Sequence, residues 1–220
     1  DAPTQPRPRG AFVLLEGVDR CGKTTQCAEL VRRLQATGRD VKAMRFPDRT
    51  TTSGQLINAY LSNMSEMDDH CIHLLFSQNR WEASNSIRAT LNANTTVVCD
   101  RYAYSGVAFS AAKPGLSVPW CRAPDSGLPA PDVVIFLDLS PEDARERGGY
   151  GEERYEKEEF QRTVRQNFFA LRQDDAASGS PPWHVVDARR SVTDIAAEIE
   201  RVALVAVAAA AEGREVAELW

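Results

Sequence analysis

Residues 12–34 read FVLLEGVDRCGKTTQCAELVRRL, and this stretch decides the fold of the 220-residue chain. It begins with a short apolar run of β-strand length, Phe12 to Glu16, and continues after a glycine-rich turn with apolar residues at helical spacing. The turn matches the pattern G-x-x-x-x-G-K-[ST] from Gly17 to Thr24. The sequence therefore predicts a strand, a phosphate-binding loop and a helix in direct succession.

The loop carries the residue types that a nucleotide site requires. Gly17 and Gly22 allow backbone N–H groups to point inward at a helix N-terminus, where they can bind phosphate. Lys23 can bridge the β- and γ-phosphate oxygens, and the Thr24 hydroxyl can bind Mg²⁺. The alternative, an ordinary glycine-rich turn, does not explain why the motif stands between a strand and a helix. We expect ATP binding with magnesium.

Four more short runs are predicted strands, and they alternate with helical segments. The expected strands beyond the first are Val41 to Phe46, Thr95 to Cys99, Val133 to Leu139 and His184 to Val186; the expected helices are Thr24 to Leu34, Leu56 to Leu61, Asp68 to Leu91, Glu158 to Asp174 and a last one from Thr193. Near-continuous apolar strands suit a parallel sheet that is covered on both faces. This pattern predicts an α/β fold of the P-loop NTPase type, with a five-stranded parallel sheet in three layers, a tail at 1–10 and one domain at 11–220.

Asp100 directly follows the predicted strand that ends at Cys99. In a P-loop fold a carboxylate at the end of a neighbouring strand completes the metal site, so we assign Asp100 to Mg²⁺ together with Thr24. The ordinary alternative is an aspartate that ends a strand or caps a helix, which is common in α/β folds.

Composition limits the partners. A net charge of −5 argues against a broad nucleic-acid surface. There is no apolar run of about 18 residues, so no membrane span is expected. The five cysteines lack a C-x-x-C pair, which favours free thiols in a cytosol-like compartment. His70, Cys71 and His73 lie close together, but without further ligands they are better interpreted as ordinary helix residues than as a metal site.

Six ordered blocks of the chain together resemble the eukaryotic type of the thymidylate kinase family. They are EGVDRCGKT (16–24), RFPDR (45–49), HLLFSQNRWE (73–82), DRYAYSGVAFSAAK (100–113), PDSGLPAPD (124–132) and GEERYE (151–156). The resemblance implies transfer of the γ-phosphoryl group of ATP to dTMP, giving dTDP and ADP. It also implies a homodimer, a mobile lid at about 147–156, and a location in the cytoplasm, with the nucleus as a second location.

By this resemblance, four residues carry catalysis. Lys23 and Arg20 contact the transferring phosphoryl group, and an arginine inside the P-loop is what distinguishes the eukaryotic type. Asp19 holds the acceptor sugar, and Arg101 clamps the acceptor phosphate. Around ATP, the family pattern adds Thr25 and the lid arginines Arg147 and Arg154, and the turn 187–190 is similar to its adenine-contacting loop.

The resemblance also implies an acceptor site made of residues from several blocks. Arg49 clamps the dTMP phosphate with Arg101, Phe76 stacks on thymine, Arg80 bonds a base carbonyl, and Phe109 excludes a 2′-hydroxyl. The remaining assigned contacts are Phe46, Ser105, Gly106, Tyr155, Glu156 and Gln161. For Phe76 the alternative is plain core packing, and Tyr102 is either a core tyrosine or a substrate contact.

Two other functions remain open from the sequence. A deoxynucleoside kinase shares the P-loop but needs a carboxylate base near the sugar 5′ position, where this chain has Arg49. A P-loop switch protein would lack a second set of phosphate clamps, and the guanine-reading motif N-K-x-D is absent.

Overall fold

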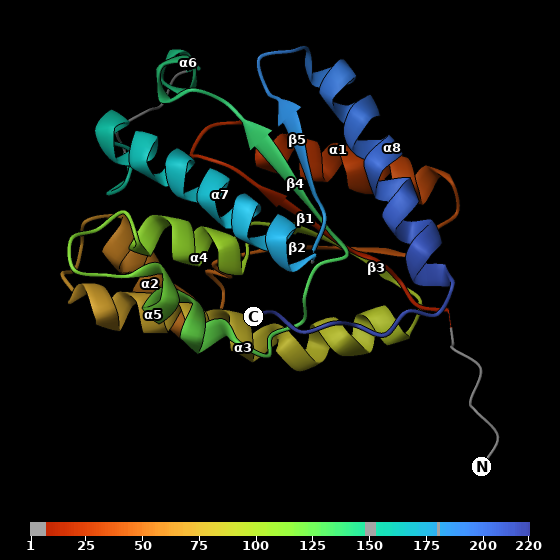
Figure 1. Cartoon of the computed structure of the whole chain (residues 1–220), viewed down its shortest axis with the longest axis horizontal. Coiled ribbons are helices and arrows are strands. Elements are labelled where there is room, and N and C mark those ends of the chain that lie inside the picture. Colours follow the sequence, from red (N-terminus) through yellow and green to blue (C-terminus); the bar gives the residue numbers. More distant parts are fainter. Residues whose placement is uncertain (1–7, 148–152, 180) are drawn as a thin grey trace.

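The computed structural model describes residues 8–147, 153–179 and 181–220. The elements in chain order are β1 (Phe12–Glu16), α1 (Lys23–Ala36), β2 (Val41–Arg45), α2 (Thr52–Leu61), α3 (Asp69–Asn92), β3 (Thr96–Asp100), α4 (Ala103–Ser110), α5 (Val118–Arg122), the 3₁₀ helix η1 (Ala123–Asp125), β4 (Val133–Asp138), α6 (Pro141–Glu146), α7 (Glu158–Ser178), β5 (Trp183–Asp187) and α8 (Val192–Ala211). All strand pairs are parallel, and the order is β2-β3-β1-β4-β5 (Figure 1). The predicted α/β fold with a five-stranded parallel sheet is confirmed.

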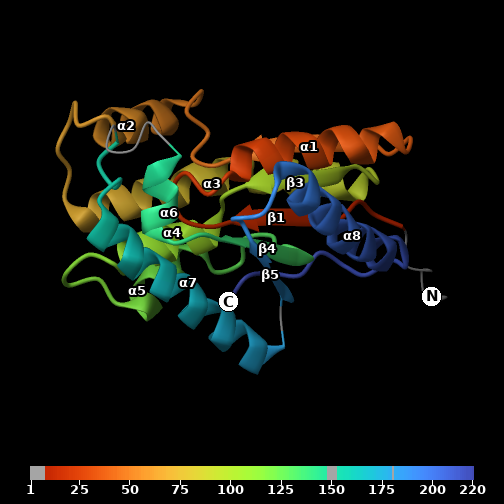
Figure 2. The same ribbon diagram turned by 90° about the horizontal axis from the view of Figure 1, so that it is seen from above.

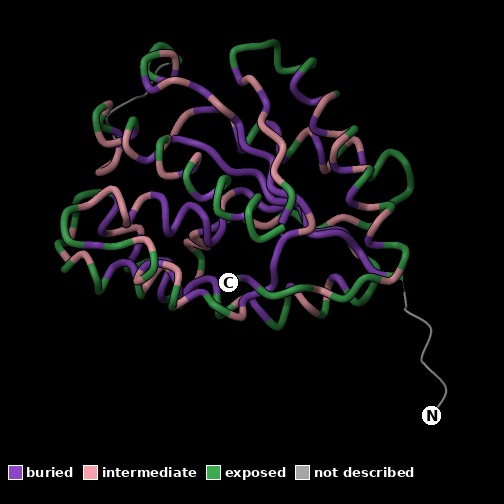
Figure 3. The backbone as a smooth tube through the Cα atoms, in the orientation of Figure 1, coloured by how far each residue is buried: buried purple, intermediate pink, exposed green. Residues whose placement is uncertain are grey.

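The sheet separates two hydrophobic cores. Phe12 and Leu14 of β1 point to the side covered by α3, α4 and α7, whereas Val13 and Leu15 point to the side covered by α1 and α8 (Figure 2). Each of these four side chains is fully buried, and burial of one such side chain stabilises a fold by roughly 1.5–3 kcal/mol. The central strands are accordingly the most continuously buried part of the chain (Figure 3).

The same sheet brings the candidate residues together, because the carboxyl ends of parallel strands meet at one edge. β1 lies in the middle of the sheet, and Leu15 is in register with Asp100 of β3. Asp100 is also in register with Arg45, at the end of β2. The loop after β1 therefore opens beside the ends of β2 and β3, which places the phosphate-binding motif at a common edge with Asp100.

The structure corrects several boundaries. β3 includes Asp100 as its last residue, and α2 begins at Thr52 instead of Leu56 because the Thr51 side chain accepts a hydrogen bond from Gly54 N and caps the helix. α4, α5, η1 and α6 were not predicted. α4 is buried on nearly every side, so it lacks the amphipathic pattern that reveals a surface helix, and the other three are six residues long or shorter.

The predicted tail at 1–10 reaches too far. Residues 1–7 lie outside the described part, but Arg9 is buried and both of its terminal nitrogens bond the Asp132 carboxylate at 2.7 Å. Gly10 N donates to Leu91 O. The fold therefore begins at about Arg9, since this pair fastens the chain just before β1. Within the described residues, no helix is both long and apolar enough to cross a lipid bilayer, and the five cysteines are unpaired.

Candidate active site

The loop between β1 and α1 has the conformation that the motif predicts. Gly22 has φ +101°, a left-handed value that other residues rarely adopt, and it directly precedes the first residue of α1. No side chain caps this helix start, in contrast to α2, α3, α6 and α8. Free N–H groups and the positive end of the helix dipole can therefore bind an anion here.

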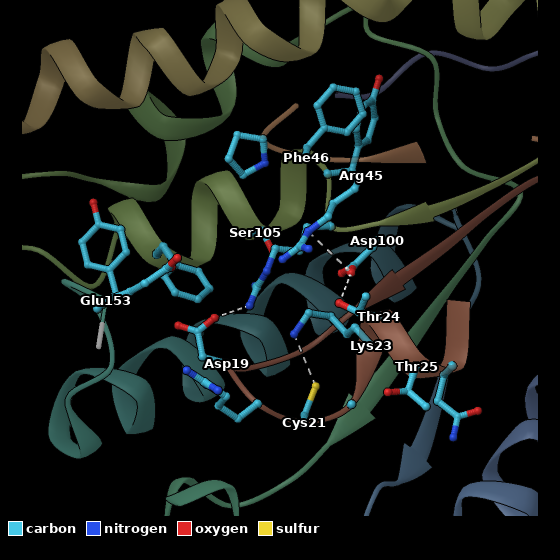
Figure 4. A pocket seen from close by; sticks show the side chains of 18 of the residues that line it. Asp19, Cys21, Lys23, Thr24, Thr25, Arg45, Phe46, Asp100, Ser105 and Glu153 are labelled. Atoms are coloured by element: carbon cyan, nitrogen blue, oxygen red, sulfur yellow. Dashed lines mark hydrogen bonds and ion pairs between the residues drawn. The ribbon is translucent and has the colours of Figure 1, made fainter. Parts of the chain in front are cut away.

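Lys23 is buried and folds back over the loop. Its Nζ donates to Val18 O at 2.6 Å and Gly17 O at 3.1 Å, and lies 3.4 Å from Cys21 Sγ. Figure 4 shows Lys23 between Cys21 and Thr24. The ammonium group is thus held at the loop by neutral acceptors, which a phosphate can replace without breaking an ion pair.

Thr24 and Asp100 form the arrangement expected of a magnesium site. Thr24 Oγ1 donates to Asp100 Oδ2 at 2.6 Å, and Arg45 Nε lies 3.8 Å from the same oxygen (Figure 4). The other oxygen, Asp100 Oδ1, is buried and has no hydrogen-bond partner in the described residues. A hydroxyl and a carboxylate beside a phosphate loop are the hard oxygen ligands that Mg²⁺ prefers, so these residues fit the ion.

Asp19 is held by two partners from distant parts of the chain. Its carboxylate bonds Arg101 through Oδ1 and Gln161 Nε2 through Oδ2 at 2.6 Å, while Gln161 Oε1 accepts from Asp19 N at 3.0 Å. Burial acts to lower the pKa of Arg101, but the carboxylates of Asp19 and Asp100 outweigh burial and raise the pKa overall. Arg101 also donates to Ser105 Oγ at 3.1 Å. The three predicted residues Asp19, Arg101 and Gln161 thus form one network.

Arg20 and Arg49, two of the arginines assigned to phosphate groups, both contact carboxylates of the segment that precedes α7. Arg20 Nε bonds Glu156 Oε1 at 2.8 Å. Arg49 donates to Glu153 Oε1 and to Asn58 Oδ1, each at 2.8 Å. Carboxylates and phosphates are both oxyanions that a guanidinium binds by charge-assisted hydrogen bonds. These contacts therefore mark Arg20 and Arg49 as anion-binding groups at the cavity.

Phe76 and Arg80 lie one turn apart on α3 and both line the cavity. Phe76 is half-buried: it packs against the small core cluster around Ile57 and Ile72 and also lines the cavity, so its ring can contact a bound group there. Arg80 is buried, and Asp125 holds it through two hydrogen bonds. Tyr102 also borders the cavity, but it is almost fully buried beside Phe12 and Phe46, and burial raises the pKa of its hydroxyl.

Phe109 lines the cavity and contacts Tyr155, which lies within the predicted lid at 147–156. Its ring centroid lies 5.7 Å from that of Tyr155, which stacks on Phe160 at 5.2 Å. The Arg101 guanidinium lies over the Phe109 ring, 5.1 Å from its centroid. Burial raises the pKa of Tyr155, so its hydroxyl remains protonated at neutral pH.

The two lid arginines have different surroundings. Arg147 lines the cavity and donates to Cys21 O and Ala188 O, so it connects the P-loop with the 187–190 turn. Arg154 instead bonds Glu66 and Tyr60 O and is not among the residues that line the cavity. The structure therefore does not bring Arg154 to the predicted ATP site. Residues 148–152 of the predicted lid lie outside the described part.

These residues line a single cavity of about 630 Å³. Of the predicted residues it gathers Asp19, Arg20, Gly22, Lys23, Thr24, Thr25, Phe46, Arg49, Phe76, Arg80, Asp100, Arg101, Ser105, Gly106, Phe109, Arg147, Tyr155 and Glu156. Gly17, Arg154 and Gln161 do not line it, although Gly17 and Gln161 bond residues that do.

Sequence reasoning missed Arg45, Glu153 and Gln26, which also line the cavity. Arg45 and Glu153 stand inside blocks that carried the family pattern, so their position was a usable signal. Gln26 gives no such signal. His73, considered above as a metal ligand, is buried between Ser110 Oγ at 2.7 Å and Cys121 O at 3.0 Å, and burial together with Arg80 lowers its pKa to about 4.

Comparisons with known proteins agree with this geometry. The family model described as thymidylate kinase matches residues 15–199. Among similar proteins, a thymidylate kinase of Danio rerio is 50% identical, over 96% of this chain and 98% of its own length, and one of Homo sapiens is 44% identical over the same shares. A thymidylate kinase structure from Candida albicans superposes with a TM-score of 0.85 at 33% identity, covering 96% of this chain and 99% of that one.

Proposed function

The chain belongs to the thymidylate kinase family, and we propose that its cavity transfers the γ-phosphoryl group of ATP to dTMP, giving dTDP and ADP. The relatives that it matches are phosphotransferases, and so is this chain. The observation that supports this best is that one cavity of about 630 Å³ is lined both by Lys23 and Thr24 of the phosphate loop, called the donor end here, and by Arg49, Phe76 and Arg80 from the loop after β2 and from α3, called the acceptor end. A site with phosphate-binding groups at both ends suits two phosphorylated substrates facing each other.

We assign the donor to the P-loop end. Gly17, Gly22 and Thr25 belong to the loop and helix start that receive the ATP phosphates, and Lys23 releases its carbonyl partners to bond them. Arg20 stabilises the charge that develops on the transferring group, since a guanidinium fixed near that group acts as an arginine finger does in other P-loop enzymes. Arg147 lies against the 187–190 turn, where the nucleoside part of ATP would follow.

Mg²⁺ would be held by Thr24 and Asp100, whose unpartnered Oδ1 offers a ligand atom. When bound, the ion supplies charge neutralisation of the β- and γ-phosphate oxygens. The test of this assignment is Asp100→Asn, which should raise the Mg²⁺ concentration needed for half-maximal rate. An unchanged magnesium dependence in a folded variant would remove Asp100 from the site.

The acceptor belongs to the other end. Arg49 and Arg101 clamp the dTMP phosphate, Phe46, Phe76 and Arg80 contact the base region, and Asp19 holds the sugar while Arg101 and Gln161 keep its carboxylate oriented. Ser105, Gly106, Phe109 and Tyr155 complete the walls of this part. A phosphate acceptor is already ionised at neutral pH, so positioning and cationic groups are sufficient and no strong general base is required.

A coupled ADP-release assay tests the function directly. The unmodified protein should use dTMP far better than dCMP, dGMP or thymidine, with dUMP as a close analogue. Thymidine as the better acceptor would support a deoxynucleoside kinase instead. Nucleotide hydrolysis without any acceptor would support a switch protein.

We further propose a homodimer that uses the outer face of α3. Leu74 and Trp81 are 47% and 42% exposed and are seven residues apart, so they share one face of the helix. Exposed apolar side chains that share a face favour an interface. Sedimentation equilibrium should give twice the chain mass, and Leu74→Glu should shift the protein to monomer. A wild-type monomer would refute the proposal.

For location, we propose the cytoplasm with the nucleus as a second site. The five unpaired cysteines support a reducing compartment. Fluorescent tagging of the full-length protein in its own cells would test this, and retention in a secretory compartment would contradict it.

A further inference from the structure

Asp125 is a fully buried carboxylate that has no role in the function described above. It ends η1, within the block 124–132, and is 0% exposed. A buried charge is costly to desolvate unless it is paired and hydrogen-bonded. A fully buried Asp125 carboxylate therefore requires a cationic partner, and its burial requires a structural or functional explanation.

The partner is Arg80. Asp125 Oδ1 accepts from Arg80 Nε at 3.1 Å and Asp125 Oδ2 accepts from Arg80 Nη2 at 2.6 Å, so the carboxylate takes one edge of the guanidinium in a two-bond fork. The Arg80 side chain is only 3% exposed, but it lines the cavity. Among the described residues no hydrogen bond is found for its remaining nitrogen, Nη1.

Gly106 fixes the guanidinium from another side. A Cβ atom at this position would come within 2.7 Å of Arg80 Nη2 and 2.9 Å of Nη1. Only glycine allows such a close approach, so the guanidinium lies against the backbone of α4 while Asp125 holds its edge. The plane and the direction of the group are both determined by these two neighbours.

Asp125 is itself firmly held by α3. Ser77 Oγ donates to Asp125 Oδ1 at 2.7 Å and lies 3.0 Å from Pro124 O, while Trp81 Nε1 donates to Pro124 O at 2.7 Å. His73 contacts Cys121 O from the same helix. These side chains attach the segment 121–125 to the helix that carries Arg80, so the carboxylate and the guanidinium cannot move apart independently.

We propose that Asp125 is a positioning residue for base selection: it fixes the Arg80 guanidinium, a group that carries only N–H donors, so that these donors face the acceptor base. A donor-only group accepts a base that presents a carbonyl oxygen and rejects one that presents an amino group at the same edge. Thymine and uracil carry a carbonyl where cytosine carries an amino group. The inference rests on the proposed function and names the residue that sets its selectivity.

The test is Asp125→Asn, which keeps the size but places an N–H₂ group opposite Arg80. Because small misplacement of a positioned group can cost up to about a hundredfold, we expect kcat/KM for dTMP relative to dCMP to fall by about tenfold or more, mainly through KM for dTMP. The ratio of dTMP to dUMP and the KM for ATP should stay within about twofold, because neither depends on that edge of the base.

Asp132→Asn is the matched control. Asp132 stands in the same block and forms a two-bond pair with Arg9, at 2.7 Å for each bond, but does not line the cavity. Loss of a merely structural ion pair should lower the melting temperature of both variants, whereas only Asp125→Asn should change base selection. In an Arg80→Ala background, Asp125→Asn should have no further effect on the ratio.

If Asp125→Asn does not fold, Ser77→Ala tests the proposal instead. This variant removes one hydrogen bond to Asp125 and keeps the Asp125 charge. The kcat/KM for dTMP relative to dCMP should then fall by a smaller factor, about threefold. The proposal is overturned if a folded Asp125 or Ser77 variant keeps the wild-type ratio, or if the control changes the ratio equally. This failure differs from failure of the proposed function, in which the unmodified protein would not phosphorylate dTMP at all.

Discussion

The two ends of the cavity are built in different ways. Most of the proposed donor end comes from one continuous stretch, Gly17 to Thr25, which supplies backbone N–H groups and the side chains of Arg20, Lys23 and Thr24. Asp100 and Arg147 join it from other parts of the chain. The acceptor end collects side chains from α3, α4, the loop after β2 and the segment before α7. The donor end therefore depends on backbone geometry, and the acceptor end depends on side chains that other side chains hold in place.

This difference indicates that the donor end recognises phosphate and that the acceptor end recognises the nucleoside. Phosphates of any nucleotide can use the same backbone cradle, because the cradle reads charge and not the base. The acceptor end must distinguish one nucleoside from others, and its supporting contacts, such as Asp19 with Gln161 and Arg80 with Asp125, are correspondingly numerous. Changes at the donor end should lower turnover for every acceptor, whereas changes at the acceptor end should alter acceptor choice.

The largest effect is expected at the donor end. Lys23→Ala and Arg20→Ala should each reduce kcat by about a hundredfold or more, because charge stabilisation in the transition state is lost. Circular dichroism should show an intact fold. Lys42→Ala, which changes an exposed lysine on β2, serves as the control and should retain activity. Near-normal turnover in either donor-end variant would contradict the assigned mechanism.

The next effect should be confined to the acceptor. Arg49→Ala removes a charge-assisted contact of roughly 1.5–3 kcal/mol, so kcat/KM for dTMP should fall about tenfold to a hundredfold while ATP affinity stays constant. Arg49→Lys should restore only part of the loss, because an ammonium lacks the planar pair of donors. Initial rates at saturating MgATP and calorimetry of ATP binding measure the two quantities. If Arg49→Ala lowered ATP affinity as much as it lowered kcat/KM for dTMP, the two ends of the cavity would not act separately.

A smaller change is expected in sugar selection. Phe109→Ala should open space near the sugar and lower the preference for dTMP over its ribonucleotide by about tenfold, since steric selection of this size is worth 1–3 kcal/mol. Phe160→Ala is the control, because Phe160 packs against Phe109 at 6.2 Å and stacks on Tyr155 at 5.2 Å between ring centroids, but does not line the cavity. If both variants change the preference equally, Phe109 acts by supporting Tyr155.

The smallest effect concerns stability behind the acceptor end. The pKa of His73 in the fold is about 4, lowered first by burial and then by Arg80, against an ordinary value of 6.5. Between pH 7 and pH 6 the unfolded chain takes up a proton at this residue and the folded chain does not, so acid lowers the stability. The expected loss from His73 over this range is about 0.7 kcal/mol.

Urea unfolding at the two pH values measures this loss. His73→Asn should remove it from the pH dependence, whereas His70→Asn, on the exposed side of the same helix, should retain it. An identical pH dependence in the wild type and the His73 variant would show that the buried histidine is not the source.

The sequence predicted the sheet well because its three central strands, β1, β3 and β4, are almost wholly buried apolar runs. Phe12–Glu16 was placed correctly at both ends, and the other strands shifted by one residue at some boundaries. α4 was missed because buried helices show no apolar periodicity. Arg9 was assigned to a tail because its pairing with Asp132 joins residues 123 positions apart, which no local pattern reveals.

The proposed donor site follows from the residues alone, whereas the proposed acceptor site follows only from resemblance to a family. The motif G-x-x-x-x-G-K-[ST] indicates phosphate binding by itself, because residues that are neighbours in the chain are also neighbours in the site. Phe76, Arg80 and Phe109 have no such signature, because a phenylalanine or arginine on a helix more often serves packing or solvation. Arg154 was assigned to ATP on the same basis, and the structure places it on Glu66 instead.

By itself, then, the sequence determined the order of the five strands and of α1, α2, α3, α7 and α8, and the phosphate loop. It also led to the proposal that Thr24 and Asp100 hold the metal, because these inferences depend on residues close together in the chain or on the ends of strands. The tertiary structure decided which side chains support the acceptor end. Asp125 meets Arg80 across 45 residues, and Gln161 meets Asp19 across 142. Such pairs form only when the sheet has brought α3, η1 and α7 to their places, so their roles follow from packing and not from local sequence.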